Sequence, residues 1–239
     1  MGQTKSQEPA PDSKPDILGD VFCQGIVHAS QKLKEYLGFE DPQNRLQPST
    51  DTLNEIFLVS FISYCAEKGV EEHITTSTMT KQQRLLFGVD WIWTILGPDK
   101  NVKIQFPVQT SQMSDQALRS QMRDTEKCYG NIKEITLADA LYKNKSNYEK
   151  LEEFCSLVGR DCVGMFIVFG VPGKPKDIRG ALLDSVKNRR NKNSPPGDVM
   201  VKDFFLNTDE FLSTREMLER CCKKKNSLKD LGNVYINFL

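Results

Sequence analysis

The segment FGVPGKPKDIRG, residues 169–180, has the glycines and basic side chains that phosphate-binding loops use. A P-loop has the pattern G-x-x-x-x-G-K-[ST], in which backbone N–H groups cradle the phosphates and the last hydroxyl binds Mg²⁺. Here Val168 stands where the first glycine is needed, and Pro175, which has no hydroxyl, follows Lys174. The segment is therefore interpreted as a tight connection from a strand to a helix, with its basic side chains in solvent.

Cysteines and histidines are the other side chains that could act as nucleophiles or metal ligands. The seven cysteines form neither C-x-x-C pairs nor a disulfide framework, and their odd number favours a reducing compartment. With only His28 and His73, a zinc site would need unusual cysteine spacings, so we predict no metal site, no cofactor and no catalytic residue. The alternative is a cysteine-dependent hydrolase that uses Cys155 or Cys162 with a histidine, which a reactive thiol of low pKa would favour.

The charge balance limits which partners the protein can attract. Basic and acidic side chains both number 32, so the formal net charge is zero. Such a chain has no overall field that would attract nucleic acid or an anionic bilayer. The basic runs at residues 187–192 and 223–225 are interpreted as solvated helix ends, and no nucleic-acid partner is predicted.

The N-terminus has the one motif that points to a lipid. Gly2 and Ser6 satisfy M-G-x-x-x-[ST], the pattern for N-myristoylation of Gly2, although the same residues could simply begin a disordered tail. Residues 1–15 are polar and contain three prolines, so we predict a flexible tail. The tail has no basic cluster, and one acyl chain alone binds a membrane only marginally. Because no secretory signal and no membrane span is found, a cytoplasmic protein that is soluble or lipid-anchored is expected.

Three helices are predicted in the first hundred residues. Apolar side chains recur every three or four positions from Asp16 to Leu37, and Gly38 is a stop signal. A capping-box pair at Thr52 and Glu55 begins a second helix, whose apolar residues on most sides predict a central position. A second such box begins a third helix, which the apolar residues extend to Leu96.

Strands are predicted mainly in the rest of the chain. Residues 102–108 alternate between apolar and polar side chains, and Pro107 predicts that this strand lies at a sheet edge. Residues 163–169 are a continuous apolar run, which indicates a buried strand in mid-sheet, and residues 234–238 alternate as a C-terminal strand. Between the strands predicted at 102–108 and 163–169, residues 111–147 are expected to form a long polar loop.

Helices are expected between these strands. Ser146 and Glu149 form a further capping box, and residues 178–186 and 211–222 have helical spacing. The fold class predicted is α+β, a single domain over residues 16–239 in which a helical N-terminal half packs on a small mixed or antiparallel sheet from the C-terminal half.

Two tryptophans stand out as candidate contacts for a partner. If Trp91 and Trp93 lie in a helix, they point in nearly opposite directions, so both cannot be buried on one face. One of them would then be exposed, and exposed aromatic side chains dominate the energetics of many protein interfaces. The alternative is a central helix with neighbours on both sides.

Several blocks of the sequence resemble the Rab-15 effector family. They are IVHASQKLKEYLGFE at 26–40, TLNEIFLVSFISYCAEKGV at 52–70, FGVDWIWTILGPDK at 87–100, KLEEFCSLVGRDCVGMFIVFGVPGKPKDIRG at 150–180 and VYINFL at the C-terminus. The resemblance spans most of the chain but not residues 111–147 or the tail after Lys5. It implies a protein without catalytic activity that binds a GTP-bound Rab GTPase and regulates transferrin receptor recycling from the endocytic recycling compartment.

The resemblance also implies a location, peripheral on early or recycling endosome membranes. It supplies no short binding motif, so the partner-binding residues are predicted from physics as Phe87 with one of Trp91 and Trp93. A scaffold that binds regardless of nucleotide state is the second alternative.

Overall fold

The computed structural model describes residues 17–43, 45–113, 145–188, 197–208, 212–214, 216 and 235–238. The predicted tail at 1–15, most of the predicted loop at 111–147 and most of the predicted helix at 211–222 lie outside these residues. Helices are α1 (Ile17–Leu33), α2 (Thr50–Glu67), α3 (Lys81–Phe87), α6 (Asn147–Val158), α7 (Leu183–Asn188) and α8 (Gly197–Leu206). Strands are β1 (Ile74–Thr78), β2 (Trp91–Leu96), β3 (Val102–Gln112), β4 (Met165–Val171), β5 (Lys174–Leu182) and β6 (Tyr235–Asn237).

The strands form one sheet in the order β1-β2-β3-β4-β5-β6. Among the strands that the structure describes, only β3 and β4 form a parallel ladder, and the other neighbours are antiparallel. The α+β class with a mixed sheet is confirmed. The predicted division into a helical N-terminal half and a C-terminal sheet is wrong, because β1, β2 and β3 come before residue 113 and α6, α7 and α8 come after it.

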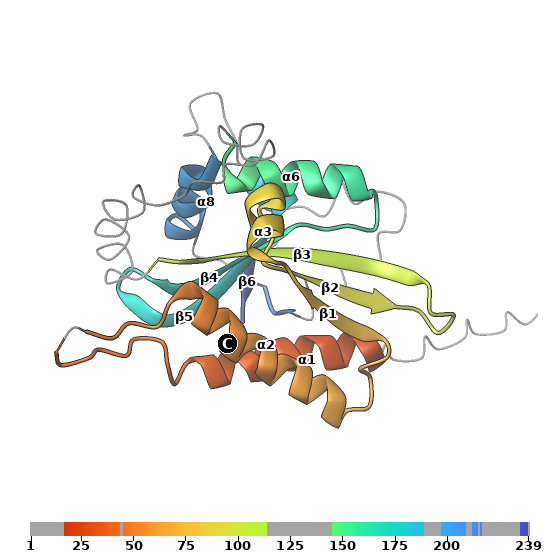
Figure 1. The fold of residues 1–239 in the computed structure, drawn as a ribbon, viewed down its shortest axis with the longest axis horizontal. Helices are drawn as coiled ribbons and strands as arrows, with labels where there is room; N and C mark the ends of the chain where they lie inside the picture. The colour runs from red at the N-terminus through yellow and green to blue at the C-terminus, as the bar shows by residue number, and fades with distance from the viewer. Residues whose placement is uncertain are drawn as a thin grey trace, which may run out of the picture.

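Helices cover both faces of the sheet (Figure 1). α1 and α2 lie against one face, and α3, α6 and α8 lie against the other. Successive side chains of a strand point to opposite faces, so a strand between two helical layers needs apolar residues at every position. In β4, Met165 and Ile167 enter the core beneath α1 and α2, whereas Phe166 and Val168 enter the core beneath α6 and α8. The prediction of a buried strand in mid-sheet is therefore confirmed.

The capping signals predict some helix starts and miss another. Complete capping boxes begin α3, at Thr80 and Gln83, and α6, at Ser146 and Glu149. α2 begins earlier than predicted, because the side chain of Ser49 accepts a hydrogen bond from the N–H of Thr52. The expected central position of α2 is also wrong, since Val59 and Ile62 on its outer face are exposed.

The segment predicted as the third helix forms a short helix, α3, followed by a strand, β2. α3 ends at Phe87 because Gly88, its C-cap, has the left-handed conformation (φ 63°) that glycine adopts easily. A side chain at Gly88 would also meet the carbonyl oxygen of Asn147, at 2.5 Å from the Cβ position. Beyond this stop, Trp91–Leu96 forms β2 and pairs with β1, a strand that the apolar pattern of the sequence does not predict.

β3 lies inside the sheet, so its predicted edge position is wrong. Pro107 is tolerated because it falls at an interruption of the pairing with β4. An isolated bridge joins Gln105 to Cys162, and the continuous ladder begins one residue after the proline, at Val108 and Met165. The missing N–H of the proline therefore interrupts no regular ladder bond.

The glycine- and proline-rich segment after β4 is the turn of a hairpin. Gly170 and Gly173 have positive φ values of 72° and 75°, and β5 follows at once, so the helix predicted for residues 178–186 is wrong up to Leu182. α7 then occupies its second half. The C-terminal strand is confirmed as β6, which pairs with β5 at Gly180 and Ile236.

Candidate functional site

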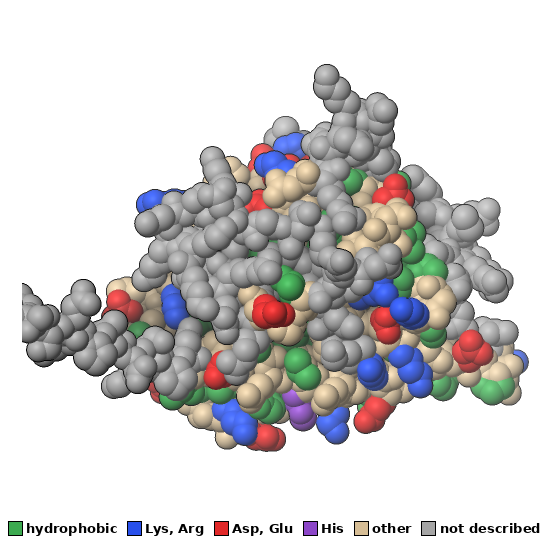
Figure 2. All heavy atoms as spheres, turned by 180° about the vertical axis from the view of Figure 1, so that it is seen from behind, with side chains coloured by type: hydrophobic (Ala, Val, Ile, Leu, Met, Phe, Trp, Pro, Cys, Tyr) green, Lys and Arg blue, Asp and Glu red, His purple; other side chains and the backbone are tan. Residues whose placement is uncertain are grey.

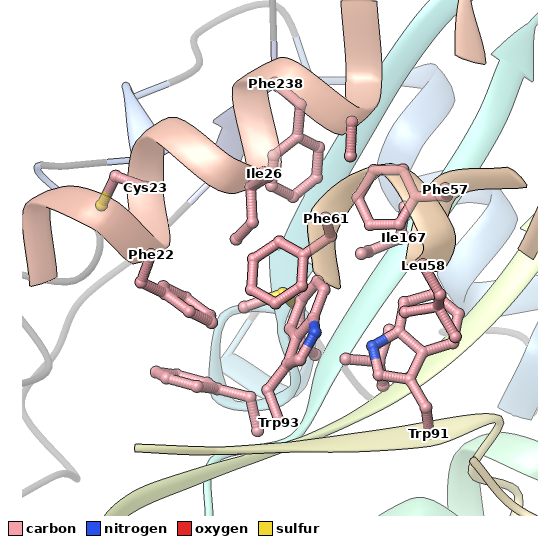
Figure 3. Close-up of a cluster of buried hydrophobic side chains, with 14 of the residues drawn as sticks. Phe22, Cys23, Ile26, Phe57, Leu58, Phe61, Trp91, Trp93, Ile167 and Phe238 are labelled. Atoms are coloured by element: carbon pink, nitrogen blue, oxygen red, sulfur yellow. The ribbon is translucent and has the colours of Figure 1, made fainter. Parts of the chain in front are cut away.

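The two tryptophans lie in the core and not at the surface (Figure 3). Because they are two residues apart in a strand, their side chains share a face, and both are 0% exposed. Trp93 packs against Phe22 and Phe61, with ring centroids 5.3 and 5.0 Å away, and Trp91 lies 6.0 Å from Phe57. The prediction that one tryptophan is exposed is wrong, because it assumed a helix where the chain forms a strand.

Phe87, the third residue predicted to bind a partner, lies on the opposite side of the sheet. It ends α3, is partly buried and packs against Phe154 of α6, with ring centroids 5.3 Å apart. The tryptophans belong to the core beneath α1 and α2. The structure therefore does not bring the three aromatic side chains together into one surface patch.

A groove at the end of α1 is lined by exposed aromatic side chains, whereas both tryptophans are buried. We call it the hairpin groove. It is a hollow of about 440 Å³ between the turn after α1, the start of α2 and the β4–β5 hairpin, which lie at the same end of the molecule (Figure 1). Its lining residues are Tyr36, Leu37, Gly38, Phe39, Glu40, Gln47, Pro48, Leu53, Gln112, Phe169, Val171, Gly173 and Pro175.

Gly38 shapes the wall of the hairpin groove. Its φ of 74° turns the chain at the end of the α1 region, and the Cβ position lies only 3.5 Å from side-chain atoms of Pro175 and Lys176. The turn can therefore rest directly on the hairpin. On either side of this glycine, Tyr36 is 47% exposed and Phe39 is 45% exposed. From the sequence alone, Gly38 is predicted only to end a helix. The aromatic residues on either side of it, Tyr36 and Phe39, are the sequence feature that could have indicated an exposed aromatic surface.

Asp41 fixes the loop that continues from this turn. Its carboxylate accepts backbone hydrogen bonds from Gln43 at 3.0 Å, Arg45 at 2.7 Å and Leu46 at 2.9 Å. These bonds, the one from Gln43 first, lower the pKa of Asp41 because they stabilise its charged form. In this loop, Leu46 is 66% exposed to solvent.

The charges near the hairpin groove have both signs. Lys174 and Lys176 of the hairpin are exposed, and Glu40 lines the groove. Seen from the back, basic and acidic side chains are also interspersed over the surface (Figure 2), in keeping with the balanced composition. A groove with exposed aromatics and a polar rim has the features of a protein-binding surface.

A second hollow, of about 390 Å³, is lined by an ion-pair network. Arg84 pairs with Asp51 and lies 3.8 Å from Asp90, whose carboxylate accepts hydrogen bonds from the N–H and hydroxyl of Thr110 at 2.7 and 2.8 Å. Loss of solvent raises the pKa of Asp90, which these bonds partly offset. Because each charge faces a partner within the chain, the network is interpreted as a structural link between α2, α3, β2 and β3.

The described residues form no nucleophile pair of cysteine and histidine. His28 packs against the ring of Tyr64, at 5.2 Å between centroids, and the Nδ1 atom of His73 is buried without a hydrogen-bond partner among the described residues. Cys155 and Cys162 interact with each other instead. Within the part of the chain that the structure describes, no three His, Cys, Asp or Glu side chains are grouped to hold a metal. None of the helices described there is long and apolar enough to span a bilayer.

Comparison with known proteins gives one consistent relationship over the whole chain. Residues 5–238 match the sequence model of the Rab15 effector family. The Rab15 effector protein of Mus musculus is 45% identical over 241 aligned residues, which cover all of both chains. These matches confirm the resemblance carried by the sequence blocks, and they extend it across the two stretches where those blocks gave no alignment. The chain belongs to the Rab15 effector family.

Proposed function

We propose that this protein binds the GTP-bound form of a Rab15-like GTPase and acts through that binding, without catalysis. The observation that carries this proposal is the 45% identity to a Rab15 effector protein over the full length of both chains. Full coverage matters because whatever surface the relative uses has a counterpart in this chain.

Nucleotide selectivity requires a difference between two affinities. In a GTPase, contacts with the γ-phosphate and Mg²⁺ order the switch loops, which are released after hydrolysis. An effector that binds only the ordered loops shifts the population toward the GTP state by its difference in affinity for the two states. A preformed surface supports this, because it is complementary to one arrangement of the loops and pays little ordering entropy on binding.

The hairpin groove is the proposed contact surface for the GTPase. Tyr36 and Phe39, which line the groove and are about half exposed, would supply aromatic anchors, and the exposed Lys174 and Lys176 of the adjoining hairpin would supply polar contacts around them. The exposed face of α2, with Val59 and Ile62, is aliphatic and lies on a convex helix, so it offers neither a hollow nor an aromatic anchor.

The nucleotide-state test is a pull-down of purified Rab15 on the immobilised protein. Rab15 is loaded with a non-hydrolysable GTP analogue in one arm and with GDP in the other. Preferential capture of the GTP form is the expected result. Equal capture would support a scaffold without nucleotide selectivity, and no capture in either arm would contradict a direct Rab15 interaction.

The contact surface is tested with the double variant Tyr36→Ala/Phe39→Ala. Loss of two aromatic anchors is expected to weaken GTP-Rab15 binding by at least about thirty-fold, since one hot-spot residue contributes about 2 kcal/mol or more. The control is Leu157→Ala, which removes a side chain that is 76% exposed on α6, across the sheet from the groove. Equal binding by wild type, the double variant and the control would exclude the groove as the contact surface.

In the cell, the proposed site of action is the membrane of early or recycling endosomes, in transferrin receptor recycling. A myristoyl group on Gly2 and a membrane-anchored Rab would be two weak attachments whose combined avidity exceeds either alone. The cellular test is the rate at which internalised transferrin returns to the medium. Depletion should slow that return, and rescue by wild type but not by a variant that has lost Rab15 binding would connect recycling to the interaction.

A further inference from the structure

Cys155 and Cys162 lie next to each other although six residues separate them. Cys155 is in the last turns of α6, and Gly159, its C-cap, donates its N–H to the carbonyl of Cys155 at 3.1 Å. Cys162 in turn donates its N–H to the carbonyl of Gly159 at 3.2 Å. These two bonds turn the chain back, so that it enters the sheet beside the helix it has just left.

The side chains meet inside this turn. The two thiols hydrogen-bond, and the N–H of Gly164 donates to the sulfur of Cys155. The packing around Gly164 independently places the sulfur of Cys155 against the segment between Cys162 and β4. A Cβ added at Gly164, two residues after Cys162, would lie only 3.0 Å from Cys155 Sγ. Glycine at this position therefore leaves the room that the sulfur occupies.

These thiols differ from Cys65, another described cysteine. The shared hydrogen bond lowers the pKa of Cys162, whose thiolate accepts it, and raises the pKa of Cys155, which donates it. Cys162 is buried, with 8% of its surface exposed, and the adjacent Cys155 is half-buried, so the pair lies closer to solvent than a fully enclosed thiol. By contrast, burial raises the pKa of Cys65 to about 12, and Cys65 is 2% exposed. Reactivity of cysteine follows its thiolate character and its access to solvent.

We propose that Cys155 and Cys162 are a modification site at which a hydroperoxide forms a reversible disulfide. The thiolate of Cys162 attacks one peroxide oxygen, the O–O bond breaks, and water (or an alcohol) leaves after taking a proton. The sulfenic acid at Cys162 is then attacked by Cys155, the S–O bond breaks, the S–S bond forms, and a second water leaves with the thiol proton. The two thiols together lose two electrons, and the peroxide gains them.

The disulfide would join the C-terminal end of α6 to the segment that leads into β4. The backbone of Cys162 already pairs with Gln105 of β3 in an isolated β-bridge. The new bond would therefore link α6 both to β3 and to the chain that leads into β4. Reduction by a small thiol reverses the reaction through a mixed disulfide, which returns both cysteines to the thiol form.

The test uses a background variant in which Cys128, Cys221 and Cys222 are replaced by serine, so that only the four described cysteines remain. The folded protein is treated with hydrogen peroxide, free thiols are alkylated, and the protein is digested with trypsin without reduction. Cleavage after Arg160 places Cys155 in peptide 151–160 and Cys162 in peptide 161–176. A disulfide therefore joins two separate peptides, with a mass two hydrogens below their sum.

The linked peptides are the expected product, and they should disappear when a thiol reductant is added before digestion. Loss of free thiol at Cys155 and Cys162 should be at least about ten-fold faster than at Cys65. In a Cys155→Ser variant, Cys162 should stop at the sulfenic acid, which dimedone traps. Linked peptides that form only in urea-unfolded protein, or oxidation of Cys65 at the same rate, would overturn the site.

Discussion

At the scale of single residues, the two indole rings carry much of the packing beneath α1 and α2. Trp91 and Trp93 meet edge to face with centroids 5.4 Å apart, the geometry in which the positive edge of one ring faces the negative face of the other. Neither indole N–H has a hydrogen-bond partner among the described residues. Burial of each large ring therefore stabilises the core, whereas burial of its unpaired N–H lowers the stability of the fold.

Trp93→Ala should lower the free energy of unfolding by about 3–5 kcal/mol, because it leaves a cavity in a closely packed core. Trp93→Phe should have a clearly smaller effect. It keeps an aromatic ring and removes a buried unpaired N–H that costs about 1–3 kcal/mol. Urea unfolding followed by circular dichroism measures both. A loss below about 0.5 kcal/mol for the alanine variant would contradict the buried position.

The loop held by Asp41 should respond to acid. The pKa of Asp41 is lowered below its ordinary 3.8, so the three backbone hydrogen bonds are complete above that pH and are lost as the pH falls through the lower, folded-state value. The amide NMR signals of Gln43, Arg45 and Leu46 should shift together in this acid range. In Asp41→Ala the shared shift should be absent, and its persistence would assign the titration to another group.

Single residues in the sequence predicted local structure correctly where one short-range interaction determines that structure. The capping boxes at Thr80 and Ser146 are confirmed because each needs only its own side chains and a neighbouring N–H. Gly88 shows the limit of such reading. Its left-handed conformation ends α3, but a lone glycine inside an apolar repeat also fits a continuing helix. The close approach of Asn147, which leaves no room for a Cβ at this position, is a tertiary feature that the local sequence does not reveal.

At the scale of elements, short apolar runs were ambiguous. The segment Trp91–Leu96 alternates buried and partly buried residues, yet its apolar residues also continue the helical spacing from α3. β1 was missed because its polar threonines give no apolar pattern, although threonine suits strands. For the β4–β5 hairpin, the turn was recognised from Pro172 and Gly173, but the partner strand was assigned to a helix.

The pairing of β5 with β6 depends on a missing side chain at Gly180. A Cβ there would lie 2.5 Å from two ring atoms of Phe238, which is 0% exposed. Gly180→Ala should therefore lower the free energy of unfolding by about 1–3 kcal/mol through overpacking. Urea unfolding measures this loss, and hydrogen exchange at β6 should rise with it.

A double-mutant cycle isolates the contact between Gly180 and Phe238. Phe238→Ala alone removes a buried ring and should cost about 3–5 kcal/mol. Adding Gly180→Ala to that variant should cost little more, because the clash has gone. If the two effects were simply additive, the close approach of the ring would not be the cause.

At the scale of the whole molecule, the hairpin groove explains why the candidate surface could not be found from the sequence. Its walls come from the turn after α1, the start of α2 and the β4–β5 hairpin, and the hairpin is distant in the sequence from the other two. Each of these segments was recognised locally as a turn or a helix start. Their meeting depends on the sheet order, and the sheet order depends on the parallel pairing of β3 with β4, for which the strand patterns carry no signal.

Gly2→Ala removes the proposed acceptor of the myristoyl group and should reduce the fraction of the protein on endosomes in cells. Binding to GTP-loaded Rab15 in solution should be unchanged, because the lipid adds only a second attachment. Fractionation and fluorescence microscopy measure the location, and the pull-down is the internal control. Full endosomal location of Gly2→Ala would show that the lipid is dispensable.

The single parallel pair also sets an order for folding. The antiparallel pairs β1–β2, β2–β3 and β4–β5 join segments that are near in sequence, so the chain closes only short loops to form them. The β3–β4 pair joins segments on either side of the long stretch around residues 114–144, which carries a greater entropic cost of closure. We expect the β1–β2–β3 meander and the β4–β5 hairpin to form early and to join at β3 and β4 in a later, slower step, as β6 must also do when it pairs with β5 from far along the chain. Mutations at the β3–β4 seam should therefore slow folding more than mutations in the hairpin turns.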